Sequence, residues 1–131
     1  HCLFAMPAVK GVAFGLGFGF AGLKGSEAND PIYSANGSIS TATNHNAGIN
    51  GGISNGMPIL IHTCIKPTPS IYKPQASVDY RTRENVTLEI KGRHDPAIIH
   101  RARIVADSLT AIGILDLWMD SAATKSFENR Y

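Results

Sequence analysis

The sequence predicts one α+β domain, with antiparallel strands and glycine-rich loops packed against one or two helices. Three observations lead to this prediction. Short runs of β-branched and aromatic residues are separated by turn residues up to residue 90, a long loop rich in glycine and asparagine covers residues 44–56, and apolar residues recur at helical spacing after residue 96. A length of 131 residues suits one domain, and a hydrophobic fraction of 44% can supply a core.

The first strand is predicted over residues 12–20, where phenylalanine and leucine alternate with glycine. Its glycine face would let another backbone or a flat ligand approach closely, although a strand packed under a helix is the simpler interpretation. Residues 23–31 are predicted to form a loop. A hairpin is expected over residues 32–43, turning at Asn36-Gly37, because that dipeptide accepts the positive φ angles of a tight turn.

The middle of the chain is predicted to alternate between loops and short strands. Residues 44–56 form a loop in which several positions are free to take positive φ, and residues 58–65 indicate a strand. The prolines in residues 66–74 end that strand and predict a rigid, extended segment. A short strand follows over residues 86–90, with its leucine and isoleucine facing inward.

The last element is a predicted helix over residues 96–119. Asp95 is a favoured N-cap, because its carboxylate can accept a hydrogen bond from a free backbone N–H, and Pro96 suits the first helical position. Residues 120–131 are polar, and we expect them to fray. The predicted core-facing stripe of the helix consists of Ile98, Ala102, Val105, Leu109 and Ile112.

Composition and residue spacing exclude several classes of function. A net charge of +2, with the basic residues scattered, argues against a nucleic-acid or anionic-membrane partner. Cys2 and Cys64 make neither a disulfide framework nor a metal site, so the default compartment is the reducing cytoplasm. The histidines lack metal-ligand spacing, and no spacing indicates a nucleophilic triad. The opening HCLFAMP resembles neither a methionine start nor a signal peptide, so we expect a piece of a longer protein.

Two segments could bind an anion through side chains, and each also has a structural interpretation. In KPTPS, Lys66 supplies a positive charge, Thr68 and Ser70 supply hydroxyls, and two prolines fix the backbone. Such a cluster suits a phosphate or the polar edge of a ring system, but it is also what a stiff surface loop looks like. In GRHDP, Arg93 is a planar fork suited to phosphate or carboxylate, whereas Asp95 is explained equally well as a helix cap.

The glycine loop is a third candidate. Backbone N–H groups bind an anion or a carbonyl only where no side chain blocks them, and glycine provides that access. The spacing matches neither the P-loop nor the dinucleotide-binding pattern, so a tight connection between strands is an equally valid interpretation.

Four strings occur in order along the chain: GSEAND at 25–30, NHNAGINGGISNG at 44–56, KPTPSI at 66–71 and GRHDP at 92–96. Together with AVKGVAFGLGF at 8–18, they resemble the C-terminal part of chorismate synthase over roughly residues 7–118. The resemblance implies that residues 1–131 are the C-terminal portion of such a domain. It further implies that they are part of a larger β-α-β sandwich whose N-terminal half lies outside this chain.

The resemblance also implies an activity. The family converts 5-enolpyruvylshikimate 3-phosphate to chorismate and phosphate, the last step of the shikimate pathway, by a 1,4-trans elimination. It requires reduced FMN although there is no net redox change, because a reduced flavin can donate charge transiently to the electron-poor centre that the leaving phosphate creates. The flavin N5 is the usual candidate for the base. Members are cytoplasmic carbon–oxygen lyases that assemble as homotetramers and are associated with NADP.

Site residues carry over position by position. The matching cofactor-binding positions are Gly51, Lys66, Thr68, Pro69, Ser70 and Arg93. Asp95 would take part in proton chemistry near the flavin while also capping the helix, and the two roles are compatible because a helix N-terminus is a natural anion site.

The sequence departs from the family's pattern at two positions. Ala13 stands where glutamate is usual, and Ala47 stands where glycine is usual, so Ala47 would crowd the loop if that position needs positive φ. The alternative to a working enzyme is an inactive fragment that acts at most as a flavin- or phosphate-binding module. An unrelated phosphate-binding module is the least favoured interpretation.

Overall fold

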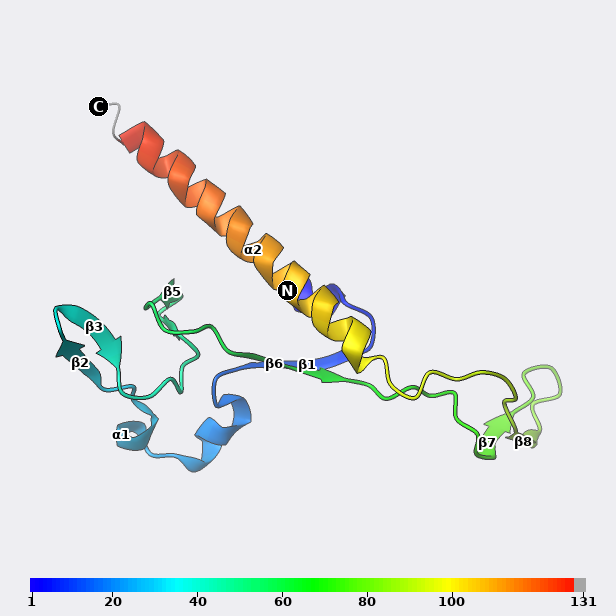
Figure 1. Ribbon diagram of the computed structural model, residues 1–131. Coiled ribbons are helices and arrows are strands. Elements are labelled where there is room, and N and C mark those ends of the chain that lie inside the picture. Colours follow the sequence, from blue (N-terminus) through cyan, green and yellow to red (C-terminus); the bar gives the residue numbers. More distant parts are fainter. Residues whose placement is uncertain (129–131) are drawn as a thin grey trace. The chain divides into compact units, whose positions relative to one another are not determined.

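The computed structural model describes residues 1–128, and the side chains of residues 1–126. The chain divides into two compact units, residues 1–65 and the part from residue 66 onward, and each is described by itself. Short antiparallel strand pairs and a long C-terminal helix confirm the α+β class (Figure 1). The elements are η1 (Cys2–Ala5), β1 (Val9–Phe14), η2 (Gly17–Gly22), α1 (Gly25–Ala28), β2 (Ile32–Ala35), β3 (Ser38–Thr41), β4 (Ile49–Asn50), β5 (Ile53–Ser54), β6 (Ile61–Ile65), β7 (Gln75–Val78), β8 (Asn85–Leu88) and α2 (Ile99–Glu128).

The first unit is built around the antiparallel pair β1–β6. The register runs from Val9 opposite Ile65 to Phe14 opposite Ile61, with a bulge between Val9 and Gly11. The 3₁₀ helix η1 packs on β1, and the buried apolar side chains of this unit come from these elements and from the glycine loop. They are Leu3, Met6, Val9 and Ala47.

The predicted strand over residues 12–20 is wrong beyond Phe14. Gly15 and Gly17 have φ angles of +55° and +52°, which turn the chain out of the strand and into η2. A Cβ on Gly15 would lie 1.8 Å from the carbonyl oxygen of His45, so this glycine is needed for the close approach of another backbone. The predicted loop over residues 23–31 also contains the single helical turn α1.

Two tight turns of the first unit follow from local sequence. The hairpin β2–β3 turns at Asn36 and Gly37, with φ angles of +53° and +79°, which confirms the prediction for residues 32–43. Positive φ angles in residues 44–56 are also confirmed, and within that loop the short hairpin β4–β5 turns at Gly51 and Gly52. Ala47 has a φ of +56° and is 0% exposed, so the position does adopt the conformation that favours glycine.

In the second unit, residues 66–74 form neither helix nor strand, as predicted, and lead into the antiparallel hairpin β7–β8. Strand β7 was not predicted, and β8 covers Asn85–Leu88 rather than residues 86–90. The inward orientation expected for Leu88 is wrong, because 43% of this residue is exposed.

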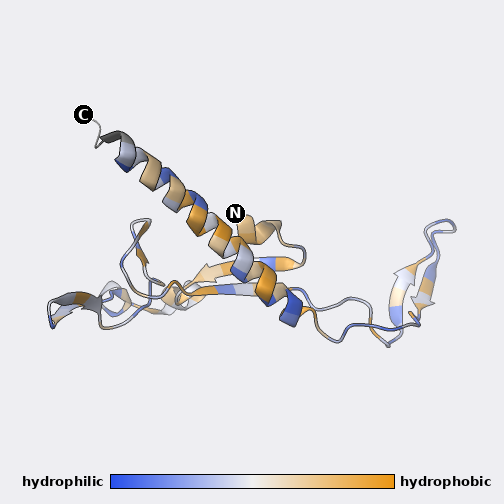
Figure 2. Cartoon of the chain, turned by 45° about the horizontal axis from the view of Figure 1, so that its top comes forward, coloured by the Kyte–Doolittle hydropathy of each residue, from blue (hydrophilic) through white to orange (hydrophobic). Residues whose placement is uncertain are grey.

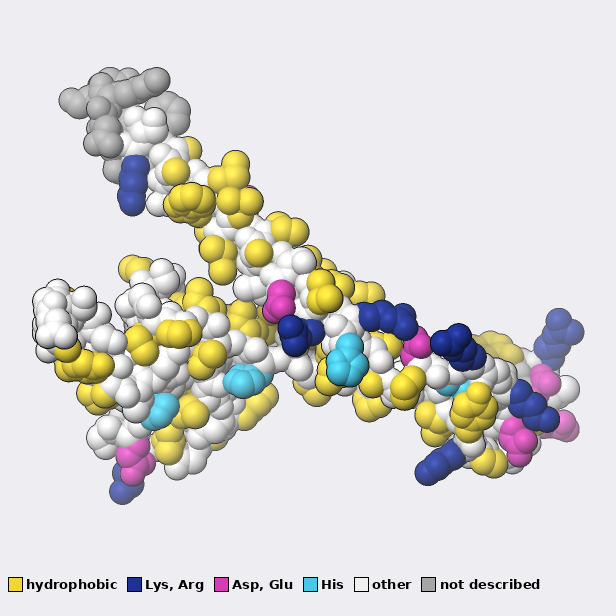
Figure 3. Space-filling model, viewed as in Figure 1, with side chains coloured by type: hydrophobic (Ala, Val, Ile, Leu, Met, Phe, Trp, Pro, Cys, Tyr) yellow, Lys and Arg dark blue, Asp and Glu magenta, His cyan; other side chains and the backbone are white. Residues whose placement is uncertain are grey.

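Helix α2 begins later and ends later than predicted. It runs from Ile99 to Glu128, so the fraying expected for residues 120–131 is wrong up to residue 128, and residues 129–131 lie outside the described part. Of the predicted core-facing stripe, Ala102 is buried, whereas Val105 and Ile112 are 45% and 61% exposed. Hydrophobic residues occupy much of α2 in Figure 2, and Figure 3 shows apolar side chains on its surface.

Periodicity therefore predicted an apolar helix correctly. It overestimated how many of the helix's apolar side chains are buried by the rest of this chain. No helix within residues 1–128 combines the length and the hydrophobicity that crossing a membrane requires.

Candidate functional site

The segments 66–74 and 89–98 are the two arms of the β7–β8 hairpin and run side by side (Figure 1). A tyrosine joins the two arms. The Tyr72 hydroxyl donates a hydrogen bond to the Gly92 carbonyl, and the Tyr72 ring meets the His94 ring edge-on, with centroids 4.7 Å apart. The His94 Nε2 atom lies 3.3 Å from the Ile90 carbonyl oxygen. The structure therefore holds Tyr72, which follows KPTPS by two residues, against Gly92 and His94 of GRHDP, although 21 residues separate Ser70 from Gly92 in the sequence.

The KPTPS arm presents a mixture of exposed and half-buried groups. Lys66 and Pro69 are exposed, whereas Thr68 and Ser70 are half-buried. The Pro69 carbonyl accepts a hydrogen bond from Gln75 Nε2 at 3.5 Å. The Thr68 Oγ1 atom is buried and has no hydrogen-bond partner. A buried hydroxyl without a partner is costly, so Thr68 Oγ1 is a candidate to bond a polar group from outside the chain.

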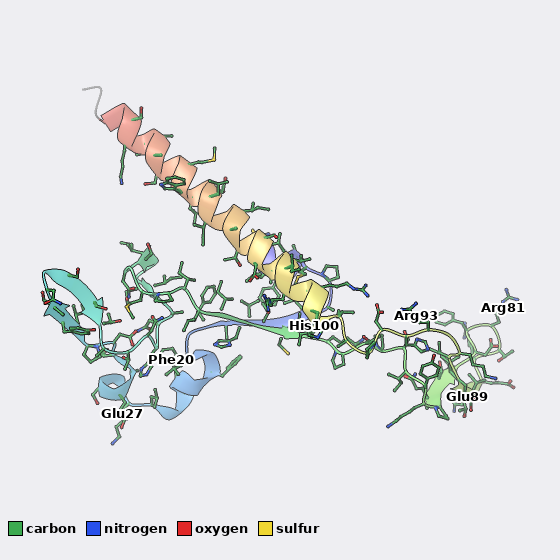
Figure 4. The ribbon with its side chains drawn as sticks, in the orientation of Figure 1. Phe20, Glu27, Arg81, Glu89, Arg93 and His100 are labelled. Atoms are coloured by element: carbon green, nitrogen blue, oxygen red, sulfur yellow. The ribbon has the colours of Figure 1, made fainter. Side chains whose placement is uncertain are left out.

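In the GRHDP arm, Arg93 is exposed between β8 and α2 (Figure 4). The Asp95 carboxylate accepts a hydrogen bond from the Arg101 guanidinium at 2.9 Å, and these side chains are 45% and 76% exposed. The prediction that Asp95 caps the helix is wrong, because α2 starts at Ile99 and the first backbone bonds of the helix run to the Ile98 carbonyl. The carboxylate instead makes a charge-assisted bond to a side chain of the first turn.

Gly51 belongs to the other unit, and so its position is described only within residues 1–65. Gly51 and Gly52 form the turn of β4–β5, with φ angles of +56° and +80°. A Cβ built on either residue would meet no atom within 4 Å. The turn is therefore open on its outer side, and its backbone is free to accept a close contact.

The functional candidate that the sequence analysis missed is Asp30, just after α1. Its side chain is only 2% exposed. Both carboxylate oxygens accept hydrogen bonds: Oδ1 from the Thr43 hydroxyl and the His45 N–H, each at 2.7 Å, and Oδ2 from the Asn46 N–H at 3.0 Å and Asn46 Nδ2 at 2.9 Å. The partners are more than ten residues away along the chain, so no local pattern revealed them.

These bonds determine the protonation of Asp30. Burial by itself raises the pKa of this carboxyl, because it disfavours the charged form. Hydrogen bonds from the Thr43 hydroxyl, the backbone N–H groups of Asn46 and His45 and the Asn46 side chain outweigh burial and hold the pKa of Asp30 well below its usual range. Asp30 is therefore an anion at neutral pH, and it is stabilised by neutral donors.

A pocket adjoins this network within the first unit. It is lined by Phe14, Phe20, Asn46 and Ile49, and so combines apolar walls with one amide. Phe20 projects from η2 (Figure 4). Within residues 1–128 there is no group of three or more histidine, cysteine or acidic side chains that could hold a metal ion.

Comparison with known proteins shows which family this chain resembles. A family model described as chorismate synthase matches residues 1–119. Chorismate synthase of Thermococcus kodakarensis is 50% identical over 114 residues, which are 87% of this chain and 32% of the relative. The enzyme of Korarchaeum cryptofilum is 48% identical over 119 residues, covering 91% of this chain and 33% of the relative.

That of Dehalococcoides mccartyi is 50% identical over 115 residues, covering 88% of this chain and 32% of the relative. The chain thus spans about a third of the length of the curated relatives that it matches. Among solved structures, a crystal structure of chorismate synthase superposes with a TM-score of 0.50 at 38% identity, over 53% of this chain and 21% of that chain.

Proposed function

Because the chain belongs to the chorismate synthase family, we propose that it is the C-terminal portion of an enzyme that eliminates phosphate from 5-enolpyruvylshikimate 3-phosphate to give chorismate. Reduced FMN is the proposed cofactor, and it would supply transient electron donation as the phosphate leaves. The observation that supports the proposal is that Tyr72 joins the two arms of the hairpin, one of which also carries the buried Thr68 hydroxyl that lacks a partner.

The residues present fit a flavin phosphate and the polar edge of its ring. Lys66 and Arg93 are exposed cations, suited to a phosphate as a point charge and as a planar fork respectively. Thr68 Oγ1 would gain the hydrogen bond that it lacks in the free chain, and Ser70 would supply a second hydroxyl. Pro69 keeps these two hydroxyls on a stiff backbone. Gly51 lies in the other unit, so its place among the proposed cofactor contacts rests on the family resemblance, and its turn is open on the outer side.

Asp95 is the proposed proton-handling group. Its Oδ2 atom is held by Arg101 at 2.9 Å, and that bond orients the carboxylate. A carboxylate fixed through one oxygen can hold or move a proton at the other, and its 45% exposure leaves it accessible to the reacting groups.

The remaining features of the whole enzyme are proposed on the same family basis. They are an N-terminal half of the enzyme that completes the site, assembly of the full-length protein as a homotetramer, a cytoplasmic setting, an association with NADP, and classification as a carbon–oxygen lyase. The alternative is that the isolated chain is inactive and acts at most as a flavin- or phosphate-binding module. The chain's share of about a third of its relatives' length favours inactivity of the chain by itself.

The test is a titration of FMN, followed by fluorescence quenching, with and without 5-enolpyruvylshikimate 3-phosphate. Arg93→Ala should weaken FMN binding about tenfold, the usual consequence of losing one charge-assisted bond. Arg81→Ala is the matched control, because Arg81 is also exposed but lies in the turn between β7 and β8 (Figure 4). Equal effects of the two variants would contradict the proposed role of Arg93. Chorismate formation by the isolated chain would contradict its proposed inactivity.

A further inference from the structure

The Asp30 carboxylate is saturated with hydrogen bonds. Each of its two oxygens accepts two bonds, which is the usual capacity of a carboxylate oxygen. Burying a charge is costly unless it is compensated, and the nearest basic atom, His45 Nδ1, is 4.0 Å away and has no hydrogen-bond partner itself. The compensation therefore comes from hydrogen-bond donors of residues 43–46, and these residues must keep their positions for the anion to remain buried.

The bonds continue from this point to the glycine turn. Asn44 Oδ1 accepts from the Gly48 N–H at 2.6 Å, and Asn44 Nδ2 donates to the Pro58 carbonyl at 2.8 Å. The Asn55 N–H donates to the Gly48 carbonyl at 2.9 Å, which closes the base of the β4–β5 hairpin. The backbone at Gly51 is thus anchored through Gly48 and Asn44 to the segment that Asp30 holds.

Asp30 also determines which way one amide faces. Asn46 Nδ2 donates to Asp30 Oδ2, so the nitrogen side of the amide is turned toward the carboxylate. The Asn46 Oδ1 atom is therefore the acceptor that remains for a ligand, and Asn46 lines the pocket with Phe14, Phe20 and Ile49. A neutral amide in place of the carboxylate would remove this preference.

We infer that Asp30 is a positioning residue of the flavin site: it fixes residues 43–48, and through them the Gly51 turn and the Asn46 amide. Asp30 itself touches no ligand in this assignment. The inference rests on the proposed function, because Gly51 is a proposed flavin contact.

The experiment compares Asp30→Asn with two other variants of the full chain. Thr43→Val removes one of the four donors to Asp30. Asp79→Asn is the matched control, because Asp79 also accepts backbone N–H bonds, from Arg81 at 2.7 Å and Thr82 at 3.1 Å, but lies in the β7–β8 turn. Amide hydrogen exchange reports the order of each segment, FMN titration reports affinity, and visible circular dichroism reports the surroundings of bound FMN.

In Asp30→Asn, exchange at the amides of Asn46 and Gly48 should rise about tenfold, while the β1–β6 amides keep their protection. FMN affinity should fall about tenfold, and the dichroism of the bound flavin should change. Thr43→Val should show a smaller loss of affinity, and Asp79→Asn should alter only the amides of its own turn.

Unchanged exchange in residues 43–48 of Asp30→Asn would overturn the inference. Increased exchange with unchanged FMN affinity and dichroism would also overturn it, and it would leave the proposed function standing if Arg93→Ala still weakens binding. If the unmodified chain binds no FMN, the proposed flavin site fails for this chain and the positioning role of Asp30 fails with it. The exchange data would then report only how Asp30 contributes to the structure of residues 43–48.

Discussion

Asp30 in the first unit differs from Asp95 and Thr68 in the second unit in how its side chain is hydrogen-bonded. In residues 1–65 the Asp30 side chain is 2% exposed, and both of its oxygens are fully hydrogen-bonded by the chain itself. In the second unit the Asp95 side chain is 45% exposed with Arg101 as its one hydrogen-bond partner among the described residues, and the Thr68 hydroxyl is buried without any partner.

The difference separates two kinds of polar residue. A group whose bonds are all internal stabilises a fixed backbone, whereas a group left unpaired or loosely paired is available to something outside the chain. By this criterion Asp30 organises the glycine loop in the free chain, whereas Thr68 and Asp95 keep bonding capacity that the chain itself does not use.

The largest effect should come from Gly15→Ala, at the point where β1 meets the organised loop. The new Cβ would lie 1.8 Å from the His45 carbonyl oxygen at a φ of +55°, so the backbone must move. We expect a loss of about 3 kcal/mol, seen as faster amide exchange at Val12 and Thr63. Gly37→Ala is the control, because its φ is +79° with no atom within 4 Å of the new Cβ, and it should cost about 1 kcal/mol. Equal losses of stability in Gly15→Ala and Gly37→Ala would show that the loop containing His45 can shift at little energetic cost.

Acid should disorder the loop of the first unit through Asp30. The pKa of Asp30 is held below its usual value, so the unfolded chain binds a proton more readily, and the carboxylate contributes stability above that usual value of about 4. The contribution should be lost progressively as the pH falls from about 5 toward the lower folded-state pKa. NMR shifts of the His45 and Asn46 amides should follow this loss, and Asp30→Asn should abolish it. An unchanged acid response in Asp30→Asn would assign the loss to another carboxyl.

Thr68→Val and Thr43→Val should have opposite effects on stability. The Thr68 hydroxyl is buried without a partner, so its removal should stabilise the free chain by about 1 kcal/mol while weakening FMN binding. The Thr43 hydroxyl donates to Asp30 at 2.7 Å, so its removal should destabilise by about 1 kcal/mol. Urea unfolding followed by circular dichroism measures both. Destabilisation by Thr68→Val would mean that this hydroxyl already has a partner.

The smallest effect is expected for Arg101→Ala. Its bond to Asp95 joins two largely exposed side chains, and pairs of that kind contribute about 0.5 kcal/mol or less. Arg103→Ala is the control, because Arg103 approaches Asp107 at 4.0 Å on the same helix. Thermal unfolding should hardly distinguish the two variants. A cost above about 1 kcal/mol for Arg101→Ala alone would mean that the Asp95–Arg101 bond stabilises the fold, and that Asp95 is not held ready for a ligand.

Local chemistry explains what could be predicted from sequence. The turn at Asn36-Gly37 was found because two adjacent residues suffice to favour it, and the end of β6 was found because prolines follow it. The extension of the first strand through Gly15 failed because alternation cannot reveal that a glycine is required by the carbonyl of His45, 30 positions further along.

For the candidate site, the GRHDP string contains Gly92 and His94, which Tyr72 contacts, but the roles assigned to the site residues stay predictions. The helix cap assigned to Asp95 overlooked the competing guanidinium of Arg101. Asp30 was missed because its partners lie in another loop, although a carboxylate before a proline and a polar cluster at residues 43–46 were both visible.

The β7–β8 hairpin brings residues that are far apart in the sequence close together in space. Its ladder and the Tyr72 contacts set how the KPTPS and GRHDP arms meet, and the turn over residues 79–84 lies beyond the ladder. Residues could therefore be inserted or removed at that turn without moving either arm. We therefore expect this turn to tolerate changes in length, whereas a single deletion within either arm would shift the Tyr72 contacts with Gly92 and His94.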